Sequence, residues 1–264
     1  MFSITEGNIK QGFDMDYIRF GSGNKALILL RGIEDGLKNV KGMGIPFAAR
    51  FRKLAKDHTV YVLGRRNDLP EEYSTRDMAE DVYSAMKYLR IEKADVVGIS
   101  MGGMIAQYLA IDHPECIDKL VLAVTASYKN MAIGTLSWLS YAENGDFASV
   151  IRDAVKLTYT KGYVLRNKVR FEMYAAYRPK DPQRFITMCH ACAEHNTYDI
   201  LDRIKCPVLI IGGGKDMIVS GDASREMRRR IPHSKLIMYK NLGHGLYEEA
   251  HDFADVIADF LICG

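Results

Sequence analysis

The chain has 264 residues, of which 48% are hydrophobic, so it is long enough for one large domain with a substantial core. Its 36 basic residues nearly balance its 33 acidic residues, and a net charge of +3 argues against a nucleic-acid or membrane partner. The N-terminus lacks the pattern of a signal peptide, and no stretch is apolar for the length of a membrane span. The cysteines are scattered, which is typical of a reducing compartment, and we expect a cytoplasmic protein; they are Cys116, Cys189, Cys192, Cys206 and Cys263.

The first part of the chain begins with strand patterns and continues as an alternation of strands and helices. Residues 14–20 alternate between apolar and polar side chains, which indicates an antiparallel edge strand. Residues 26–30 are continuously apolar, as in a strand that is covered on both faces. The next elements that we expect are a helix over 47–57, a strand over 59–63, a helix from Ser74 or Thr75 to about residue 89, and a strand over 94–99.

The second part is interrupted by a segment in which we find no convincing strand. A helix over 103–113 and a strand over 120–124 precede this segment, which contains four amphipathic stretches, at 133–141, 147–157, 163–177 and 183–195. The alternation then resumes with a strand over 208–211, a helix over 222–230, a strand over 235–239 and a helix over 247–261.

This order predicts an α/β protein with a mostly parallel sheet, right-handed crossovers and helices on both faces. We expect residues 1–126 and 205–264 to form the core. Residues 127–204 are then an all-helical insertion that covers the carboxyl edge of the sheet as a lid.

The most informative stretch is Gly98-Ile99-Ser100-Met101-Gly102, which lies between a predicted strand and a predicted helix. Strand, Gly-x-Ser-x-Gly and helix in this order form the nucleophile elbow, a sharp turn that exposes a serine hydroxyl. The glycines are needed because the turn leaves no room for a Cβ at its flanks. The alternative is a glycine-rich turn whose serine has no catalytic role, and the strand before and the helix after the motif argue against it.

A serine hydroxyl is a weak nucleophile at neutral pH, so it needs a base and a carboxylate that orients the base. Asp216 follows the strand over 208–211, and His244 follows the strand over 235–239, so both belong at the same sheet edge as Ser100. Other candidates fit less well, because they precede a strand, lie inside the last predicted helix or occupy a helix N-cap; they are His233, His251 and Asp222. We predict Ser100, Asp216 and His244 as nucleophile, acid and base.

Acyl transfer also requires hydrogen-bond donors for the oxyanion that forms on the substrate. The backbone N–H of Met101, the residue after the nucleophile, is one predicted donor. The second comes from the loop after the strand over 26–30, where we choose Ile33, because Gly32 keeps the backbone accessible.

Three further residues are candidates for the substrate pocket. Glu34 follows the predicted oxyanion donor and would favour cationic or neutral substrates, although a solvated loop acid is the alternative. Trp138 and Met217 are candidates for an apolar lining, although most such residues belong to a core.

Cys189-His190-Ala191-Cys192 with His195 has a zinc-like Cys-x-x-Cys spacing. No second pair of ligands lies nearby, and small core residues explain the two cysteines equally well. We therefore predict no metal and no cofactor.

On these residues the chain resembles the α/β-hydrolase superfamily, within it the lid-bearing esterases, enol-lactonases, cofactor-free haloperoxidases and carbon–carbon bond hydrolases. The matching features are residues 98–103, the glycine-rich turn before Asp216, and Gly243-His244 with Glu248 and an apolar last helix. The resemblance implies a fold of about eight strands and the triad named above. Two features depart from it: Arg31-Gly32 replaces the frequent His-Gly, and residues 64–70 match poorly the Asp-x-x-Gly-x-Gly-x-Ser that members often carry.

The sequence therefore predicts a serine hydrolase that cleaves a small carboxylic ester, thioester or lactone through an acyl-enzyme. The same triad would also support carbon–carbon bond hydrolysis or a perhydrolase activity of the haloperoxidase type. A protein of another class, a ligand sensor or signalling protein with slow turnover, is a further alternative. The expected partner is a small-molecule substrate, without nucleic acid or membrane, and nothing in the sequence supports an oligomer.

Overall fold

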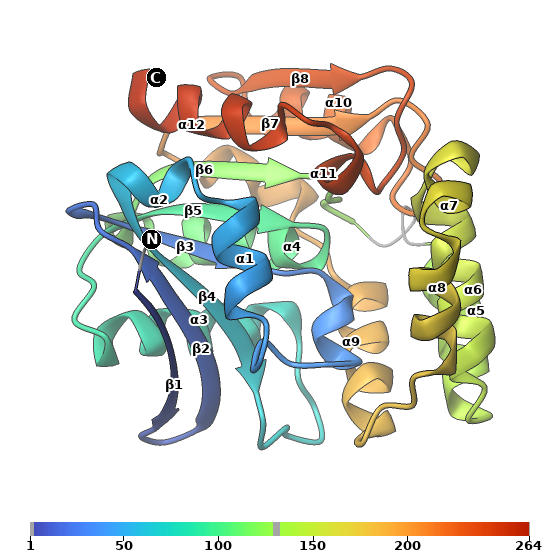
Figure 1. The fold of residues 1–264 in the computed structure, drawn as a ribbon. Coiled ribbons are helices and arrows are strands. Elements are labelled where there is room, and N and C mark those ends of the chain that lie inside the picture. Colours follow the sequence, from blue (N-terminus) through green and yellow to red (C-terminus); the bar gives the residue numbers. More distant parts are fainter. Residues whose placement is uncertain (1–2, 129–132, 264) are drawn as a thin grey trace.

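The computed structural model describes residues 3–128 and 133–263. They contain an eight-stranded sheet with the strand order β1-β2-β4-β3-β5-β6-β7-β8 (Figure 1). The six strands from β4 to β8 in this order are parallel, and β1 and β2 are antiparallel to their neighbours at one side. The predicted mostly parallel sheet is confirmed. The strands are β1 (Ile4–Lys10), β2 (Asp14–Gly21), β3 (Lys25–Leu30), β4 (His58–Arg66), β5 (Ala94–Ile99), β6 (Ile117–Ala123), β7 (Val208–Gly213) and β8 (Lys235–Tyr239).

Helices cover both faces of this sheet. One face carries α3 (Thr75–Tyr88), α4 (Met101–Asp112) and α10 (Ala223–Arg230), and the other carries α1 (Gly44–Arg50), α2 (Leu54–Asp57) and α12 (Phe253–Cys263). The short helices are η1 (Ile33–Gly36), η2 (Pro114–Cys116) and α11 (Leu246–Glu249). A capping box at Ser74 begins α3, since its hydroxyl accepts from Asp77 N–H and the Asp77 carboxylate accepts from Ser74 N–H.

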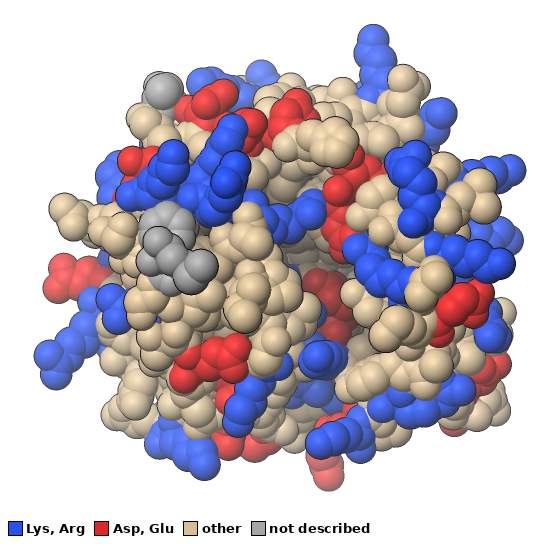
Figure 2. All heavy atoms as spheres, viewed as in Figure 1, with Lys and Arg blue, Asp and Glu red and all other residues tan. Residues whose placement is uncertain are grey.

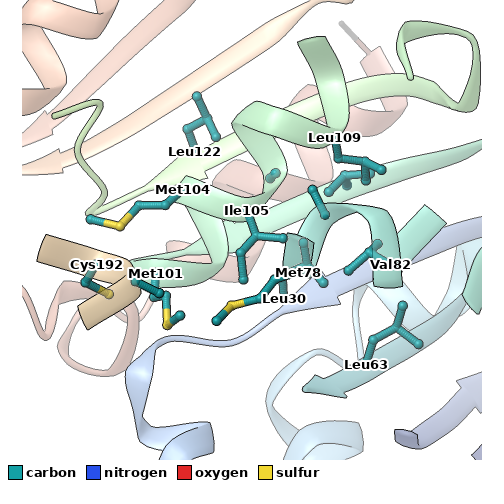
Figure 3. Close-up of a cluster of buried hydrophobic side chains, with 14 of the residues drawn as sticks. Leu30, Leu63, Met78, Val82, Met101, Met104, Ile105, Leu109, Leu122 and Cys192 are labelled. Carbon is teal, nitrogen blue, oxygen red and sulfur yellow. The ribbon is translucent and has the colours of Figure 1, made fainter. Parts of the chain in front are cut away.

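The central strands divide the core into two layers because successive side chains of a strand point to opposite faces. Ile28 and Leu30 of β3 pack with the helices on one face, whereas Leu27 and Leu29 pack with those on the other. Figure 3 shows part of the first layer, in which Leu30 lies among side chains of α3 and α4. Burial of each such side chain stabilises the fold by roughly 1.5–3 kcal/mol.

The prediction that residues 14–20 form an edge strand was wrong. β2 is an internal strand, because β1 pairs with it along its whole length and is itself the edge. The signal of β1 in the sequence is weak, because six of its seven residues are exposed or half-buried and only Ile9 is buried. An edge strand that contributes so little to the core has no apolar periodicity to reveal it.

Two expected helices are each divided in the structure. The stretch 47–57 forms α1 and α2, and the stretch 247–261 forms α11 and α12. The backbone leaves the helical region at Phe51, where ψ is 23°, and at Ala250, where ψ is 118°. The apolar pattern continues across both breaks, so it predicted helical residues but could not show where the chain turns.

Residues 127–204, which we call the β6–β7 segment, are helical in their described part. The helices are α5 (Ile133–Glu143), α6 (Phe147–Thr158), α7 (Lys161–Arg166), α8 (Lys168–Ala176), α9 (Pro182–Glu194) and η4 (Tyr198–Arg203). The helices from α5 to α9 stand beside the sheet on the side toward which β6 points (Figure 1). In the described part of this segment the extended pairing is a single bridge between Tyr128 and Asn196. None of the described helices combines the length and the apolar character that a bilayer span requires.

Candidate active site

Ser100 stands at the junction of β5 and α4 with a backbone conformation that is unusual for a residue with a side chain. Its φ is 54° and its ψ is −123°. A Cβ added to Gly98 would lie 2.6 Å from Gly102 O, and one added to Gly102 would clash with Leu30 O. The two glycines therefore let β5, α4 and the end of β3 approach closely, and this packing holds the serine in its turn.

Three side chains from distant parts of the chain form one hydrogen-bonded row. His244 Nε2 lies 2.9 Å from Ser100 Oγ, and His244 Nδ1 lies 2.8 Å from Asp216 Oδ2. Asp216 follows β7 and His244 follows β8, and parallel strands bring both loops to the carboxyl edge where Ser100 lies. His244 and Asp216 are both buried, so water competes little for these hydrogen bonds.

The Asp216 carboxylate is held in its charged form. Burial by itself raises the pKa of Asp216, but the His244 charge and hydrogen bond, with backbone amides of Val219 and Ile218, lower the pKa below its ordinary value. Oδ1 accepts from these amides at 3.0 and 2.8 Å, while Oδ2 faces the imidazole. A fixed carboxylate on Nδ1 leaves Nε2 free to take a proton from Ser100.

The two predicted oxyanion donors lie at the starts of two helices. Met101 is the first residue of α4 and Ile33 is the first residue of η1, and amides at these positions have no partner within their own helix. The loop that carries Ile33 lies directly against the nucleophile, since a Cβ added to Gly32 would lie 3.3 Å from Ser100 Cβ. The structure thus brings the elements that carry the two predicted donors together at the serine.

A buried ion cluster that no sequence pattern predicted supports this loop. Asp35 is fully buried and accepts from Arg31 Nη1 at 3.2 Å, from Arg184 Nη2 at 2.8 Å and from Arg65 N at 3.0 Å. Arg65 Nη2 donates to Arg31 O at 2.6 Å. Arg31, which replaces the frequent histidine, thus anchors the loop from behind. The cluster left little signal in the sequence, because Arg184 is 149 positions away from Asp35 and no local pattern links the two residues.

The alternative acid and bases lie away from Ser100. His233 Nε2 lies 3.1 Å from Cys206 O, and His251 is exposed in the turn between α11 and α12. Asp222 is exposed and pairs with Arg225 Nη1 at 3.0 Å. None of the three takes part in the row of Asp216, His244 and Ser100.

The three pocket candidates occupy different environments. Glu34 lies beside the nucleophile, because a Cβ on Gly32 would meet both Glu34 Oε2 and Ser100 Cβ. Trp138 is 3% exposed and donates its indole N–H to Asp153 Oδ2 at 3.0 Å, so it packs inside the β6–β7 segment. Met217 is 63% exposed and contributes little to the buried core.

The cysteines and His195 near α9 serve packing in this structure. Burial raises the pKa of the Cys192 thiol to about 12 and that of Cys189 further, so neither is a thiolate at neutral pH. Burial also lowers the pKa of His195 to about 3, and Thr75 and Thr197 hold its two nitrogens. Within residues 3–128 and 133–263, no cluster of three His, Cys, Asp or Glu side chains suits a metal ion.

The β6–β7 segment is tied to the loop that carries His244. Glu248 Oε1 accepts from Tyr159 Oη at 3.0 Å, and Oε2 accepts from Tyr163 Oη at 3.0 Å and from Arg170 Nη2 at 2.8 Å. Figure 2 shows a hollow on this face between the segment and the rest of the molecule, with charged side chains along its rim. We refer to the contacts of Glu248 as the Glu248 latch.

Comparisons with known proteins agree with this fold. Residues 25–170 match the family model described as alpha/beta hydrolase fold. An AB hydrolase superfamily protein, YisY, of Bacillus subtilis is 30% identical over 210 residues, which cover 74% of this chain and 76% of that protein. A pimeloyl-[acyl-carrier protein] methyl ester esterase of Neisseria meningitidis is 27% identical over 179 residues, or 64% of this chain and 69% of the esterase.

The fold is also shared with solved structures. The enol-lactonase of Burkholderia xenovorans LB400 superimposes with a TM-score of 0.83 at 22% identity, over 95% of this chain and 97% of the enol-lactonase. The family model matches more than half of the chain, so it shows the family as well as the fold. The chain belongs to the α/β-hydrolase family, and it is a hydrolase.

Proposed function

We propose that the protein is a serine hydrolase that cleaves a small carboxylic ester, thioester or lactone through an acyl-enzyme. The observation that carries this proposal is the row from Asp216 through His244 to Ser100, with hydrogen-bond distances of 2.8 and 2.9 Å. Such a row lowers the cost of removing the serine proton at the moment of attack. The name of the relative from Neisseria meningitidis, a methyl ester esterase, supports the ester class.

In the first half of the reaction, Ser100 Oγ attacks the carbonyl carbon while His244 Nε2 takes the hydroxyl proton. The negative charge on the carbonyl oxygen is received by the N–H groups of Met101 and Ile33. When the tetrahedral intermediate collapses, the bond to the leaving oxygen or sulfur breaks, and His244 gives that atom the proton. The acyl group remains bonded to Ser100 Oγ.

In the second half, His244 takes a proton from water, and the resulting hydroxide oxygen attacks the acyl carbon. The bond from the carbonyl carbon to Ser100 Oγ then breaks and His244 returns the proton to the serine. The carboxylic acid leaves, and the enzyme is restored. Asp216 keeps its charge throughout and stabilises the imidazolium in both halves.

We also propose that the β6–β7 segment is a lid over this site. Its support is the position of the helices beside the carboxyl edge of the sheet (Figure 1) and the Glu248 latch.

The four free cysteines found among the described residues fit a reducing compartment such as the cytoplasm.

A fluorophosphonate probe tests the nucleophile, because it phosphonylates an activated serine. We expect labelling of the wild type and of Ser140→Ala, which removes an exposed hydroxyl from α5, and no labelling of Ser100→Ala. Hydrolysis of a 4-nitrophenyl ester should fall by at least about a thousandfold in the Ser100 variant alone. Labelling of all three proteins at equal rates would contradict the proposal.

A further inference from the structure

The Glu34 carboxylate is a partly exposed acid that lies beside Ser100. Its side chain is 46% exposed. A Cβ built on Gly32 would lie 3.3 Å from Ser100 Cβ, and it would clash with Glu34 Oε2. Both atoms therefore lie next to the same position. The carboxylate and the serine are therefore neighbours.

The two oxygens of this carboxylate have different surroundings. Oε1 accepts from Gly32 N–H at 3.2 Å and lies 3.5 Å from Arg31 Nε. Oε2 makes no hydrogen bond within the described part of the chain. One oxygen thus fixes the loop, and the other is available to a molecule bound at Ser100.

Arg31, which pairs with Glu34 Oε1, is shared with other partners. Arg31 Nη1 donates to Asp35 and to Lys38 O, and Arg184 Nη2 donates to Asp35. Tyr247 also senses the Glu34 charge: burial and this charge raise the pKa of Tyr247 well above its ordinary value, so the phenol is neutral. The ion pair with Arg31 makes its shortest contact at Glu34 Oε1, so it weakens the negative charge there more than at Oε2.

We propose that Glu34 Oε2 is an anionic subsite that takes a cationic group of the substrate, such as an ammonium. The reacting carbonyl carbon must lie about 3–3.5 Å from Ser100 Oγ, so the group would be attached a few bonds from that carbon. A carboxylate in the same place would be repelled. This inference rests on the proposed serine hydrolase function.

Two pairs of isosteric substrates test the subsite. Acetylcholine and 3,3-dimethylbutyl acetate differ in a charge on the alcohol side, and the 4-nitrophenyl esters of 4-(trimethylammonio)butanoate and 5,5-dimethylhexanoate differ in a charge on the acyl side. The enzymes are the wild type, Glu34→Gln and Glu172→Gln. Glu172 is an exposed acid of α8, so its variant has the same change of net charge away from Ser100.

For at least one pair we expect the ratio of kcat/KM, cationic over neutral, to fall about three- to tenfold in Glu34→Gln and to stay constant in Glu172→Gln. The effect is modest because Glu34 is nearly half exposed and contacts Arg31. Equal losses on both members of each pair would assign Glu34 to loop positioning alone and overturn the subsite. If Ser100 is labelled by the probe and the ratios are unchanged, the inference fails while the proposed function stands; if Ser100 is not labelled, the proposed function itself fails.

Discussion

Ser100 combines an unfavourable backbone conformation with a specific chemical position. A non-glycine residue at φ 54° and ψ −123° costs of the order of 1–3 kcal/mol relative to a relaxed strand or helix. The buried strand β5 and the start of α4 supply that energy through their packing, since all six residues of β5 are buried. This backbone conformation places Oγ within hydrogen-bond distance of His244.

The choice between Asp216 and Asp222 as the acid can be tested at the level of one atom. Asp216→Asn removes the charge opposite His244 Nδ1 and allows the wrong imidazole tautomer, so kcat should fall by roughly three to four orders of magnitude. Asp222→Asn should leave kcat near the wild-type value, because this side chain is exposed and pairs with Arg225. Steady-state kinetics on a 4-nitrophenyl ester measures both, and equal losses would contradict the assignment of Asp216.

His195 should make the stability of the fold depend on pH. Its pKa is lowered from 6.5 to about 3 by burial, so between these values the unfolded chain binds more protons than the folded one. The free energy of unfolding therefore falls as the pH decreases through this window, by up to about 1.4 kcal/mol per pH unit for one proton.

Urea unfolding between about pH 4 and pH 7 measures this dependence. His195→Asn should lower the slope of the unfolding free energy against pH by the contribution of close to one proton. His190→Asn should leave this slope unchanged, because His190 is exposed on α9 nearby. The slope is the relevant quantity, since the substitution also changes the stability at neutral pH. An unchanged slope in His195→Asn would show that other groups cause the loss of stability in acid.

At the scale of elements, η1 and α9 are joined by charges that are buried. Arg184 donates to Asp35 through Nη2, to Asp35 O through Nε and to Arg65 O through Nη2, with distances of 2.8, 3.2 and 2.9 Å. The two elements also pack closely, since a Cβ on Gly36 would meet Phe185. The oxyanion loop thus has its support in the β6–β7 segment as well as in the sheet.

Replacing Arg184 by methionine should weaken this support. The change leaves Asp35 with fewer donors in a buried site, so the free energy of unfolding should fall by about 3 kcal/mol. Because the loop carries Ile33, kcat should also fall, by about tenfold or more, under conditions in which the protein remains folded. Arg152→Met, on the exposed face of α6, is the control; matching losses in both variants would argue against a specific role of Arg184.

Sequence patterns at this scale predicted elements better than their connections. Buried strands such as β3 and β5 were evident, because residues covered on both faces must be apolar. β1 was missed because nearly all of its side chains are exposed or half-buried. The Asp35 cluster was missed because its members are polar and distant in sequence, and only the packed chain shows that Arg31 and Arg184 both meet Asp35.

At the scale of the whole molecule, the Glu248 latch connects the β6–β7 segment to the core. Neighbouring contacts reinforce it, since Thr160 donates to Glu249 through both its N–H and its hydroxyl. Gly245 N–H also donates to Thr158 O at 2.7 Å. These contacts lie within a few residues of His244 in the chain, so motion of the segment away from the core would disturb the base.

Glu248→Gln should loosen the latch and leave the core intact. A neutral amide holds Arg170 less strongly than a carboxylate, so the segment should open more often. Hydrogen exchange of amides in α7 and α8 should become faster by about threefold or more, while exchange in β5 and β6 stays the same. kcat/KM should fall in parallel; faster exchange throughout the sheet would indicate global destabilisation instead.

The sequence by itself determined the order of buried strands and helices and the three loops that carry Ser100, Asp216 and His244. It did so because burial on both faces, tight turns and nucleophile activation each demand particular residue types at fixed local spacing. Only the tertiary structure decided that Arg31 faces Asp35, that Glu34 Oε2 is open beside Ser100, and that Glu248 joins the β6–β7 segment to the His244 loop. Contacts between polar residues far apart in the chain depend on how elements pack, and no local pattern records them.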